Sequence, residues 1–370
     1  MKCIDIIKNI ENWAPKEIAW QKDNVGLQIG DTDKRVKNIL LCLELNDNVV
    51  EEALNNKCNL IISHHPFFFS PLKKIDITHD SNSRLIQKLI KRDLILYSAH
   101  TNLDYTKDGV SYKLAERLEL QNIKFLTNLN SSQYKISVFV PEKDCEVVAE
   151  AIFSAGGGVI GEYSKCSFRT KGNGTFKNSG KTHPAIGKKD GFNSVNEVKL
   201  EVIVDRWKLN SVLSEIKKVH PYEEISYDLI PLENSNVNYG IGAVGNLSRD
   251  YKLNDFLSFL SHKLIIKNFR YAKGKNDIIR NVAVCGGSGS EYYKDAVDKN
   301  CDAFITADIK YHTFQEAKGK ILMVDAGHYE TEIFSLGEIK KRIIQHLNNN
   351  KNTKVYLYSG STNPVIFYNY

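Results

Sequence analysis

The stretch Asn59-Leu60-Ile61-Ile62-Ser63-His64-His65-Pro66 places two adjacent histidines directly after a short apolar run. Such a run, bounded by polar residues, predicts a buried strand over residues 60–62. In open α/β sheets, ligands bind at the edge formed by the carboxyl ends of the strands. Successive side chains of a strand point to opposite faces, so His64 and His65 suit two different metal ions better than one. Two partly exposed loop histidines are the alternative interpretation.

A second predicted strand, residues 94–97, ends in the same way. It is followed by Ser98-Ala99-His100-Thr101-Asn102-Leu103-Asp104, which again places polar side chains at the carboxyl end of a strand. Asp104 is a candidate to ligate or bridge a metal ion. Thr101 and Asn102 are better interpreted as turn residues that bond to the local backbone.

A third cluster follows the apolar run at residues 321–324. His328 and Glu332 are four residues apart, which on a helix places both side chains on one face. Alone, such a pair is usually a surface contact. Three clusters after three strands favour a shared site for two divalent ions that leaves positions open for water. The predicted ligands are His64, His65, Asp104, His328 and Glu332.

Two further segments are candidates for contacts to the substrate. Gly286-Gly287-Ser288-Gly289-Ser290 lies between a predicted strand and a predicted helix, where amides near Gly287 and Ser288 can hold an anion. A tight turn is the equal alternative. Residues 306–312 also follow a predicted strand. Their side chains Lys310 and His312 are candidates to contact a substrate or to hold the metal ligands in place. Helix capping by Asp308 is the structural alternative there.

The elements around these motifs predict an α/β fold. Short apolar runs alternate with helical patterns, which is typical of βαβ units with a mainly parallel sheet. This alternation occurs twice, so we expect two α/β halves, residues 1–127 and 237–370, around a dinuclear metal site. The predicted strands are 39–43, 60–62, 94–97, 281–285 and 303–306, and the predicted helices are 47–56, 83–92, 253–261 and 330–347.

Residues 128–236 follow a different pattern and are expected to form an inserted domain. They predict strands at 134–140, 198–204 and 225–230 and helices at 143–153 and 208–218, with a glycine-rich irregular segment in between. This β-α-β, β-α-β order suggests a ferredoxin-like α+β unit.

Composition limits the classes of function. The 370 residues are 42% hydrophobic and 25% charged, which is typical of a globular protein of about two domains. A net charge of +6 without a block of like charges predicts no nucleic-acid partner and no membrane partner. Seven scattered cysteines without a Cys-x-x-Cys pair indicate reduced thiols. No apolar run approaches the ~18 residues of a membrane span, so we expect a soluble, cytoplasmic protein.

Six motifs follow one another along the two flanking halves. They are Trp20 with Asp23-Asn24-Val25-Gly26-Leu27-Gln28, Ser63-His64-His65-Pro66, Thr101-Asn102-Leu103-Asp104, Gly286-Gly287-Ser288-Gly289, Thr306-Ala307-Asp308-Ile309-Lys310-Tyr311-His312 and Gly327-His328-Tyr329-x-Thr331-Glu332. Together they resemble the GTP cyclohydrolase I type 2 homologue family, also called NGG-interacting-factor-three-like dinuclear-metal proteins. The chain differs at Glu44, where the family often has aspartate, and at Ala307, where glycine is usual. Gly172-x-Gly174-x-Phe176 and His220-Pro221-Tyr222-Glu223-Glu224 resemble the CutA-like or PII-like insert of long bacterial members.

The resemblance implies the same five metal ligands and places His100 and His312 in the pocket, where they are candidates to move protons as catalytic residues. It also implies two divalent ions per chain, zinc first and iron or manganese as alternatives, and a homohexameric ring built as a trimer of dimers.

The function expected on this basis is a metal-dependent hydrolase that activates water, with a nucleotide such as GTP as the substrate suggested by the family name. A metallophosphoesterase is the enzymatic variant. The alternative from another class is a metal-binding hexameric regulatory or scaffold protein whose insert senses a small ligand or partner.

Overall fold

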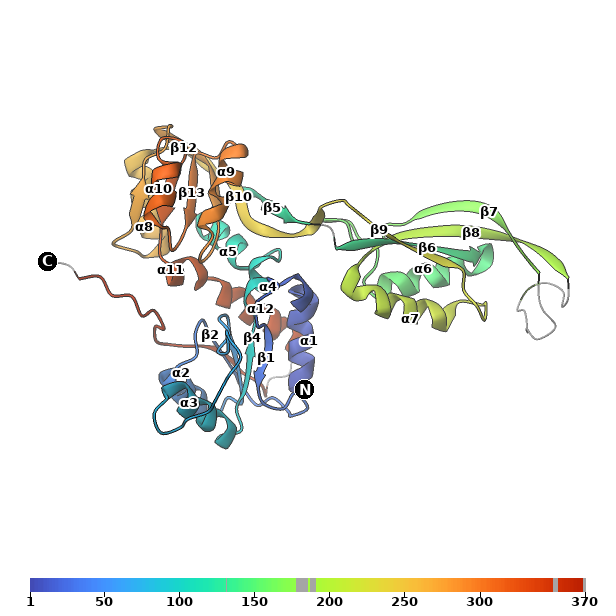
Figure 1. The fold of residues 1–370 in the computed structure, drawn as a ribbon, viewed down its shortest axis with the longest axis horizontal. Coiled ribbons are helices and arrows are strands. Elements are labelled where there is room, and N and C mark those ends of the chain that lie inside the picture. Colours follow the sequence, from blue (N-terminus) through green and yellow to red (C-terminus); the bar gives the residue numbers. More distant parts are fainter. Residues whose placement is uncertain (131, 178–185, 187–190, 349–351, 369–370) are drawn as a thin grey trace. The chain divides into compact units, whose positions relative to one another are not determined.

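The computed structural model describes residues 1–130, 132–177, 186, 191–348 and 352–368. The chain divides into two compact units (Figure 1): residues 1–127 with 239–370, and residues 128–238. The first unit is therefore built from chain on both sides of the second. Within the described residues, no helix combines the length and the apolar character needed to cross a membrane.

The first sheet of the larger unit has the strand order β1-β4-β3-β2-β15. β2, β3, β4 and β15 pair in parallel, and β1 is antiparallel to β4. Every residue of β2, β3 and β4 is buried, which explains why these strands appear in the sequence as continuous apolar runs. The bounds are β1 Gly26–Ile29, β2 Ile39–Cys42, β3 Leu60–Ser63, β4 Ile95–Ser98 and β15 Val355–Leu357.

Helices cover both faces of this sheet. α1 (Cys3–Trp13) and α12 (Ser335–Leu347) contribute to one apolar layer, and α2 (Asp47–Asn55) and α3 (Ser81–Lys91) contribute to the other. α2 and α3 start at capping side chains, Asn46 and Asp80, which accept the amide protons of Val49 and Ser83. β15 forms the edge of the first sheet and α12 covers one of its faces, and both come from the end of the chain. Residues predicted to belong to the second half therefore complete the first one.

The second sheet has the order β11-β14-β13-β12-β10-β5. β12, β13 and β14 are parallel, whereas β10 and β11 run antiparallel to their neighbours β12 and β14. The expectation of a mainly parallel sheet therefore holds only for the centre of this half. The bounds are β5 Gln121–Leu129, β10 Asn236–Lys252, β11 Arg270–Ala272, β12 Ile278–Val284, β13 Ala303–Thr306 and β14 Leu322–Asp325, with helices α4 Thr101–Asp104, α5 Val110–Arg117, α8 Leu253–Leu264, α9 Tyr293–Asp298, α10 Tyr311–Ala317 and α11 His328–Glu332.

The smaller unit is a four-stranded antiparallel sheet with the order β7-β8-β6-β9. Along the chain its elements are β6 (Gln133–Pro141), α6 (Cys145–Ser154), β7 (Phe168–Lys177), β8 (Phe192–Asp205), α7 (Leu209–Val219) and β9 (Tyr227–Pro231). α6 and α7 lie on one face of the sheet (Figure 1) and share its apolar core. β7 lies in the segment that was predicted to be irregular. The strand was missed because most of its residues are exposed and polar and show no apolar alternation.

Candidate metal centre

Three segments that follow parallel strands meet in the larger unit. His64 and His65 come directly after β3, Asp104 ends α4 after β4, and α11 after β14 carries His328 and Glu332. The five predicted ligands therefore come from segments that are up to 268 positions apart in the sequence, from His64 to Glu332.

Backbone pairing continues past the end of β3 and fixes both histidines. The His64 amide donates to the Cys42 carbonyl at 3.0 Å, and the His65 amide donates to the Leu43 carbonyl at 2.9 Å. The hydroxyl groups of Ser63 and Ser98 lie 2.8 Å apart across β3 and β4. The two strand ends are thus held in register where the site begins.

Turn geometry positions the other two segments. Asn102 accepts the His100 amide proton at 2.9 Å, which confirms its interpretation as a turn residue, and it also donates to the distant Ala14 carbonyl at 2.7 Å. The same interpretation is wrong for Thr101, whose hydroxyl accepts the Trp20 amide proton and donates to Asp23. Gly327 precedes α11 with φ 92°, and a Cβ there would lie 2.2 Å from Glu330 Oε2. Glycine is therefore required at the turn that delivers His328 and Glu332.

The buried carboxylate of Glu332 lies at the centre of the cluster. Its Oε1 is 3.0 Å from His328 Nε2 and 3.7 Å from His64 Nε2, and its Oε2 is 3.1 Å from His65 Nε2. Asp104 Oδ1 lies 3.6 Å from His64 Nε2. One carboxylate thus faces three imidazoles, an arrangement suited to bridging two ions.

The Nδ1 atom of each histidine is held by an acceptor outside the cluster. His64 Nδ1 bonds to the Ala99 carbonyl at 2.8 Å, His65 Nδ1 to Glu44 at 2.9 Å, and His328 Nδ1 to Asp308 at 2.6 Å. An imidazole that donates from Nδ1 presents the lone pair of Nε2, and metal-ligating histidines are oriented in this way. All three Nε2 atoms are therefore turned toward Glu332.

The nitrogen and oxygen atoms of the cluster are better placed to bind a metal ion than to form hydrogen bonds with one another. His64 Nε2, Asp104 Oδ1 and Glu332 Oε2 are buried without a hydrogen bond, the last despite its 3.1 Å approach to His65. Buried polar groups without a partner are costly. Grouped by ligand atoms, His64, His65 and His100 form one potential metal-binding set, and His65, His328 and Glu332 form another.

Without a bound metal, the negative charge of the buried carboxylates favours the protonated forms of the neighbouring histidines. Burial opposes protonation of His65, but Glu332 and Glu44 outweigh it and raise the pKa of His65 to about 10. In the same way Glu332 and Asp308 outweigh burial and raise the pKa of His328 to about 9. The pKa of Glu332 is held well below its usual value, because the charges of the surrounding histidines outweigh its burial. Burial raises the pKa of Asp104.

His100 lies at the edge of the cluster. Its ring centroid is 5.2 Å from that of His64 and 5.3 Å from that of His65. Its Nδ1 bonds to the buried carboxylate of Asp23 at 2.9 Å, which leaves Nε2 free of that contact. This His-Asp pair is arranged to hold or transfer a proton.

The glycine-rich loop packs against the cluster. A Cβ on Gly287 would lie 2.2 Å from Glu332 Oε1, and the Gly287 amide donates to Thr331 Oγ1 at 3.0 Å. Ser288 Oγ donates to Asp308 Oδ2, the oxygen that also faces His328 Nδ1. Asp308 therefore orients His328 and does not cap α10, whose N-cap is Lys310.

Lys310 and His312 lie apart from the cluster. Both side chains are exposed, and the ring of His312 contacts that of Tyr311 at 5.6 Å. Within the described residues, no hydrogen bond or ion pair joins either side chain to the five clustered residues. Their roles toward a substrate and in proton transfer stay predictions.

A pocket of about 650 Å³ opens beside His65 and His328. Part of its wall is the C-terminal segment, including Asn363, Val365 and Phe367. This segment is tied to the site, because Thr362 Oγ1 donates to Glu44 Oε2 and Asn363 Nδ2 donates to Glu330 at 2.8 Å. This segment could not be found from sequence patterns, because it shows no periodicity and follows no predicted strand.

Residues 1–364 match the family described as Duf34/NIF3 (NGG1p interacting factor 3). The chain belongs to the Duf34/NIF3 family. It is 38% identical over 365 residues to the "GTP cyclohydrolase 1 type 2 homolog" of Halalkalibacterium halodurans, covering 98% of each chain. It is 36% identical to the protein of the same name from Bacillus subtilis, covering 98% of this chain and 97% of the relative.

Solved structures support the same family. A Bacillus cereus protein related to NIF3 matches with a TM-score of 0.87 and 34% identity, covering 100% of this chain and 99% of the other. The family resemblance read from the six motifs is thus confirmed. Together with the histidine and carboxylate cluster, it identifies the chain as a Duf34/NIF3 protein with a candidate metal centre.

Proposed function

We propose that this protein is a divalent-metal-dependent hydrolase with a dinuclear site. One observation carries the proposal: three imidazole Nε2 atoms converge on one buried carboxylate. Several of the nitrogen and oxygen atoms that could bind a metal there are buried and have no hydrogen bond. His64, His65, Asp104, His328 and Glu332 would hold the ions, with zinc first and iron or manganese as alternatives. When bound, two such ions supply an acidified water and positive charge beside the substrate.

The residues around the site suit hydrolysis of an anionic substrate. His100, fixed through Nδ1 by Asp23, is placed to accept or return a proton at Nε2. The pocket beside His65 and His328 is lined by Arg270 as well as by apolar residues of the tail. One nitrogen of the Arg270 guanidinium bonds to Asp325 and to the Ile309 carbonyl. Its remaining N–H groups suit a phosphate group, which favours a nucleotide or another phosphorylated substrate.

The relatives named GTP cyclohydrolase 1 type 2 homolog make GTP the first substrate to test. Release of formate from GTP would support cyclohydrolase chemistry, and release of phosphate would support a phosphoesterase. We place the protein in the cytoplasm and propose a homohexamer with no nucleic-acid partner. Gly287, Ser288 and Lys310 remain candidates to contact the substrate, and His312 remains a candidate to move protons.

Metal removal tests the proposal. Protein stripped with a chelator should stay folded and inactive, and it should regain nucleotide hydrolysis when a divalent ion is added back. The Asp104→Ala variant should hold less metal by elemental analysis and show no recovery. Unfolding on chelation without any turnover before it would instead support the regulatory or scaffold alternative, in which the metal is structural.

A further inference from the structure

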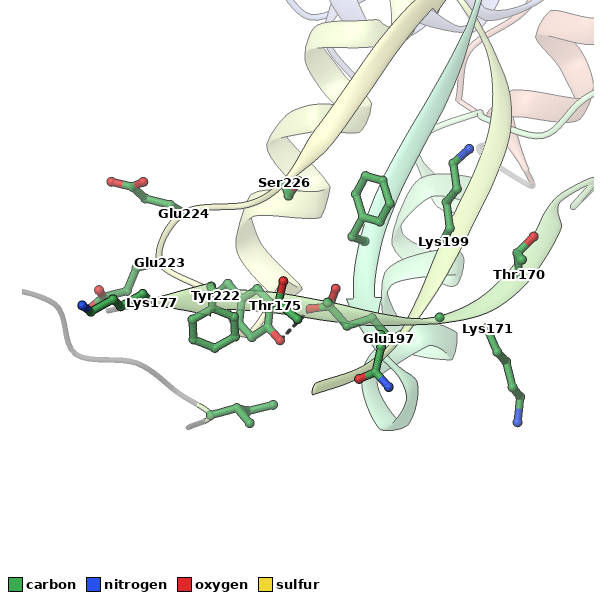
Figure 2. Close-up of a pocket in the computed structure, with 16 residues that line it drawn as sticks. Thr170, Lys171, Thr175, Lys177, Glu197, Lys199, Tyr222, Glu223, Glu224 and Ser226 are labelled. Atoms are coloured by element: carbon green, nitrogen blue, oxygen red, sulfur yellow. Dashed lines mark hydrogen bonds between the residues drawn. The ribbon is translucent and has the colours of Figure 1, made fainter. Parts of the chain in front are cut away.

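The smaller unit has a pocket of its own, of about 1080 Å³, on the face of its sheet opposite to α6 and α7. Side chains alternate along β6 and β8, so that Val138, Leu200 and Val202 enter the helix-covered core. Phe139, Glu197 and Lys199 point to the other face and line the pocket. Figure 2 shows Glu197 near the middle of this lining.

Among the residues that the structure describes, Glu197 is a carboxylate without a balancing charge. It is 9% exposed, and within the same residues its one hydrogen bond is from the Tyr222 hydroxyl to Oε1 at 2.8 Å (Figure 2). Within the described part of this unit, no lysine, arginine or histidine forms an ion pair with it. A buried carboxylate without a cationic partner is expensive, so this position is suited to receive a cation.

Glu201, four residues further along the same strand and on the same face, shows the contrast. Its carboxylate lies 3.2 Å from Lys199 and 3.9 Å from Lys135, and it accepts a hydrogen bond from Ser137. The neighbouring Lys171 pairs with Glu142. Lys199 and Lys171, which also line the pocket, are therefore paired with other carboxylates.

Among the described residues, the histidine beside the pocket is His220, and it carries no charge that could compensate Glu197. His220 Nε2 donates to the Phe139 carbonyl at 3.0 Å, and His220 Nδ1 accepts the Tyr222 amide proton at 3.1 Å. A ring that donates at one nitrogen and accepts at the other is neutral. Asp144, which acts electrostatically on both His220 and Tyr222, adds negative charge, and its buried Oδ2 has no hydrogen-bond partner.

Both sequence motifs of the insert build this pocket. Gly174 leaves room for the carboxylate, since a Cβ there would lie 2.0 Å from Glu197 Oε2. Phe176 packs edge-on against Tyr222, with ring centroids 6.1 Å apart. Aromatic rings beside a carboxylate are a typical setting for an organic cation, because ring faces attract positive charge and cover an apolar stem.

We propose that the pocket around Glu197 and Tyr222 binds a small organic cation, an amine or guanidinium group on an apolar stem. The cationic group donates to Glu197, and the stem lies against Phe139, Phe176 and Tyr222. This site belongs to the smaller unit and is independent of the metal centre.

Calorimetric titration of the full-length protein tests the proposal, with agmatine, putrescine and methylguanidine as cations and butane-1,4-diol and inorganic phosphate as controls. At least one cation should bind saturably, whereas the diol should not. Glu197→Gln should weaken this binding by at least about tenfold, because it removes a charge-assisted hydrogen bond. Tyr222→Phe should weaken it less.

Glu201→Gln is the matched control and should bind like the wild type. Gly174→Ala keeps the charge but displaces the carboxylate, so it should also lose binding, and it tests the site even if Glu197→Gln misfolds. Absence of saturable binding by all three cations would overturn the proposal. Equal affinity in the wild type and Glu197→Gln, or phosphate binding in place of cation binding, would overturn it as well.

Discussion

The Nε2 atoms of His65 and His328 lie 3.2 Å apart, although 263 positions separate the two residues in the chain. Both rings are anchored through Nδ1 by carboxylates, Glu44 and Asp308, so both lone pairs point into the same space. Two facing lone pairs repel each other unless a proton or a metal ion lies between them. Whether a proton or a metal ion lies between these two nitrogen atoms therefore determines the charge of the site.

Metal binding is expected to release protons. At pH 7 the metal-free pair holds at least one proton, because the pKa values of His65 and His328 are raised to about 10 and about 9. A metal ligand must be deprotonated, so affinity should rise with pH. Zinc titrations in buffers of different ionisation enthalpy measure the released protons. Glu332→Gln should reduce both the metal content and the proton release.

Glu330→Gln is the control for that variant, because Glu330 lies on the same helix and bonds to Asn363 of the tail. It should keep the wild-type metal content. Equal metal content in Glu332→Gln and the wild type would contradict the bridging role of Glu332.

The tail should influence the metal centre through Glu44, which joins His65 Nδ1 to Thr362 Oγ1. Glu44→Gln should lower metal affinity by about 10- to 100-fold, since outer partners of ligating histidines have effects of this size. Thr362→Val should have a smaller effect in the same direction. Competition with a chromogenic chelator measures both. Ser359→Ala, which loses a contact to Glu52 only, should bind metal normally.

Gly287 should tolerate no side chain. Alanine there would clash with Glu332 Oε1, and at φ +61° it would also add about 1–2 kcal/mol of backbone strain. Gly319→Ala separates the two effects, because Gly319 has φ +74° but open space around its Cβ. We expect both variants to lower the thermal midpoint, and Gly287→Ala alone to lose metal. Full metal content in Gly287→Ala would show that Glu332 can move without consequence.

Asp23 should contribute stability that depends on pH. Burial raises its pKa, but hydrogen bonds from His100 and Thr101 outweigh burial and lower the pKa from 3.8 to about 2. A carboxyl group whose folded pKa is depressed stabilises the fold above its unfolded pKa and loses this contribution as the pH falls. The shift corresponds to about 2 kcal/mol, lost between about pH 4 and pH 2.

Thermal unfolding of metal-free protein at pH 3 and pH 6 measures this contribution. Asp23→Asn should lower the midpoint at pH 6 and reduce the difference between the two pH values. Asp250→Asn removes an exposed carboxylate paired with Arg280 and should leave the difference unchanged. An undiminished pH dependence in Asp23→Asn would assign the effect to other carboxylates.

The parts of the fold that the sequence predicts are those where burial is uniform. β2, β3 and β4 are buried on both faces, so apolar runs locate them within one or two residues. α2 and α3 are marked by capping residues and by periodicity. The single helix predicted over 330–347 is instead two helices, α11 and α12, separated by Ile333 and Phe334.

The parts that could not be predicted depend on tertiary contacts. β7 is exposed, so its register comes from pairing with β8 and not from its own pattern. The five clustered residues were found because each follows a strand or shares a helix face. Glu44, Asp23 and Thr362 act through neighbours that are distant in the chain, so spacing along the sequence carries no sign of them.

β5 and β10 are neighbouring strands of one sheet, and the chain leaves the larger unit along the first and returns along the second. The smaller unit is thus inserted between two neighbouring strands that would otherwise form a hairpin. Excising it and rejoining the two strands with a tight turn would leave the described hydrogen-bond partners of the metal centre intact, because all of them belong to the larger unit. The cation pocket and the metal centre could accordingly be gained, lost or exchanged separately in evolution.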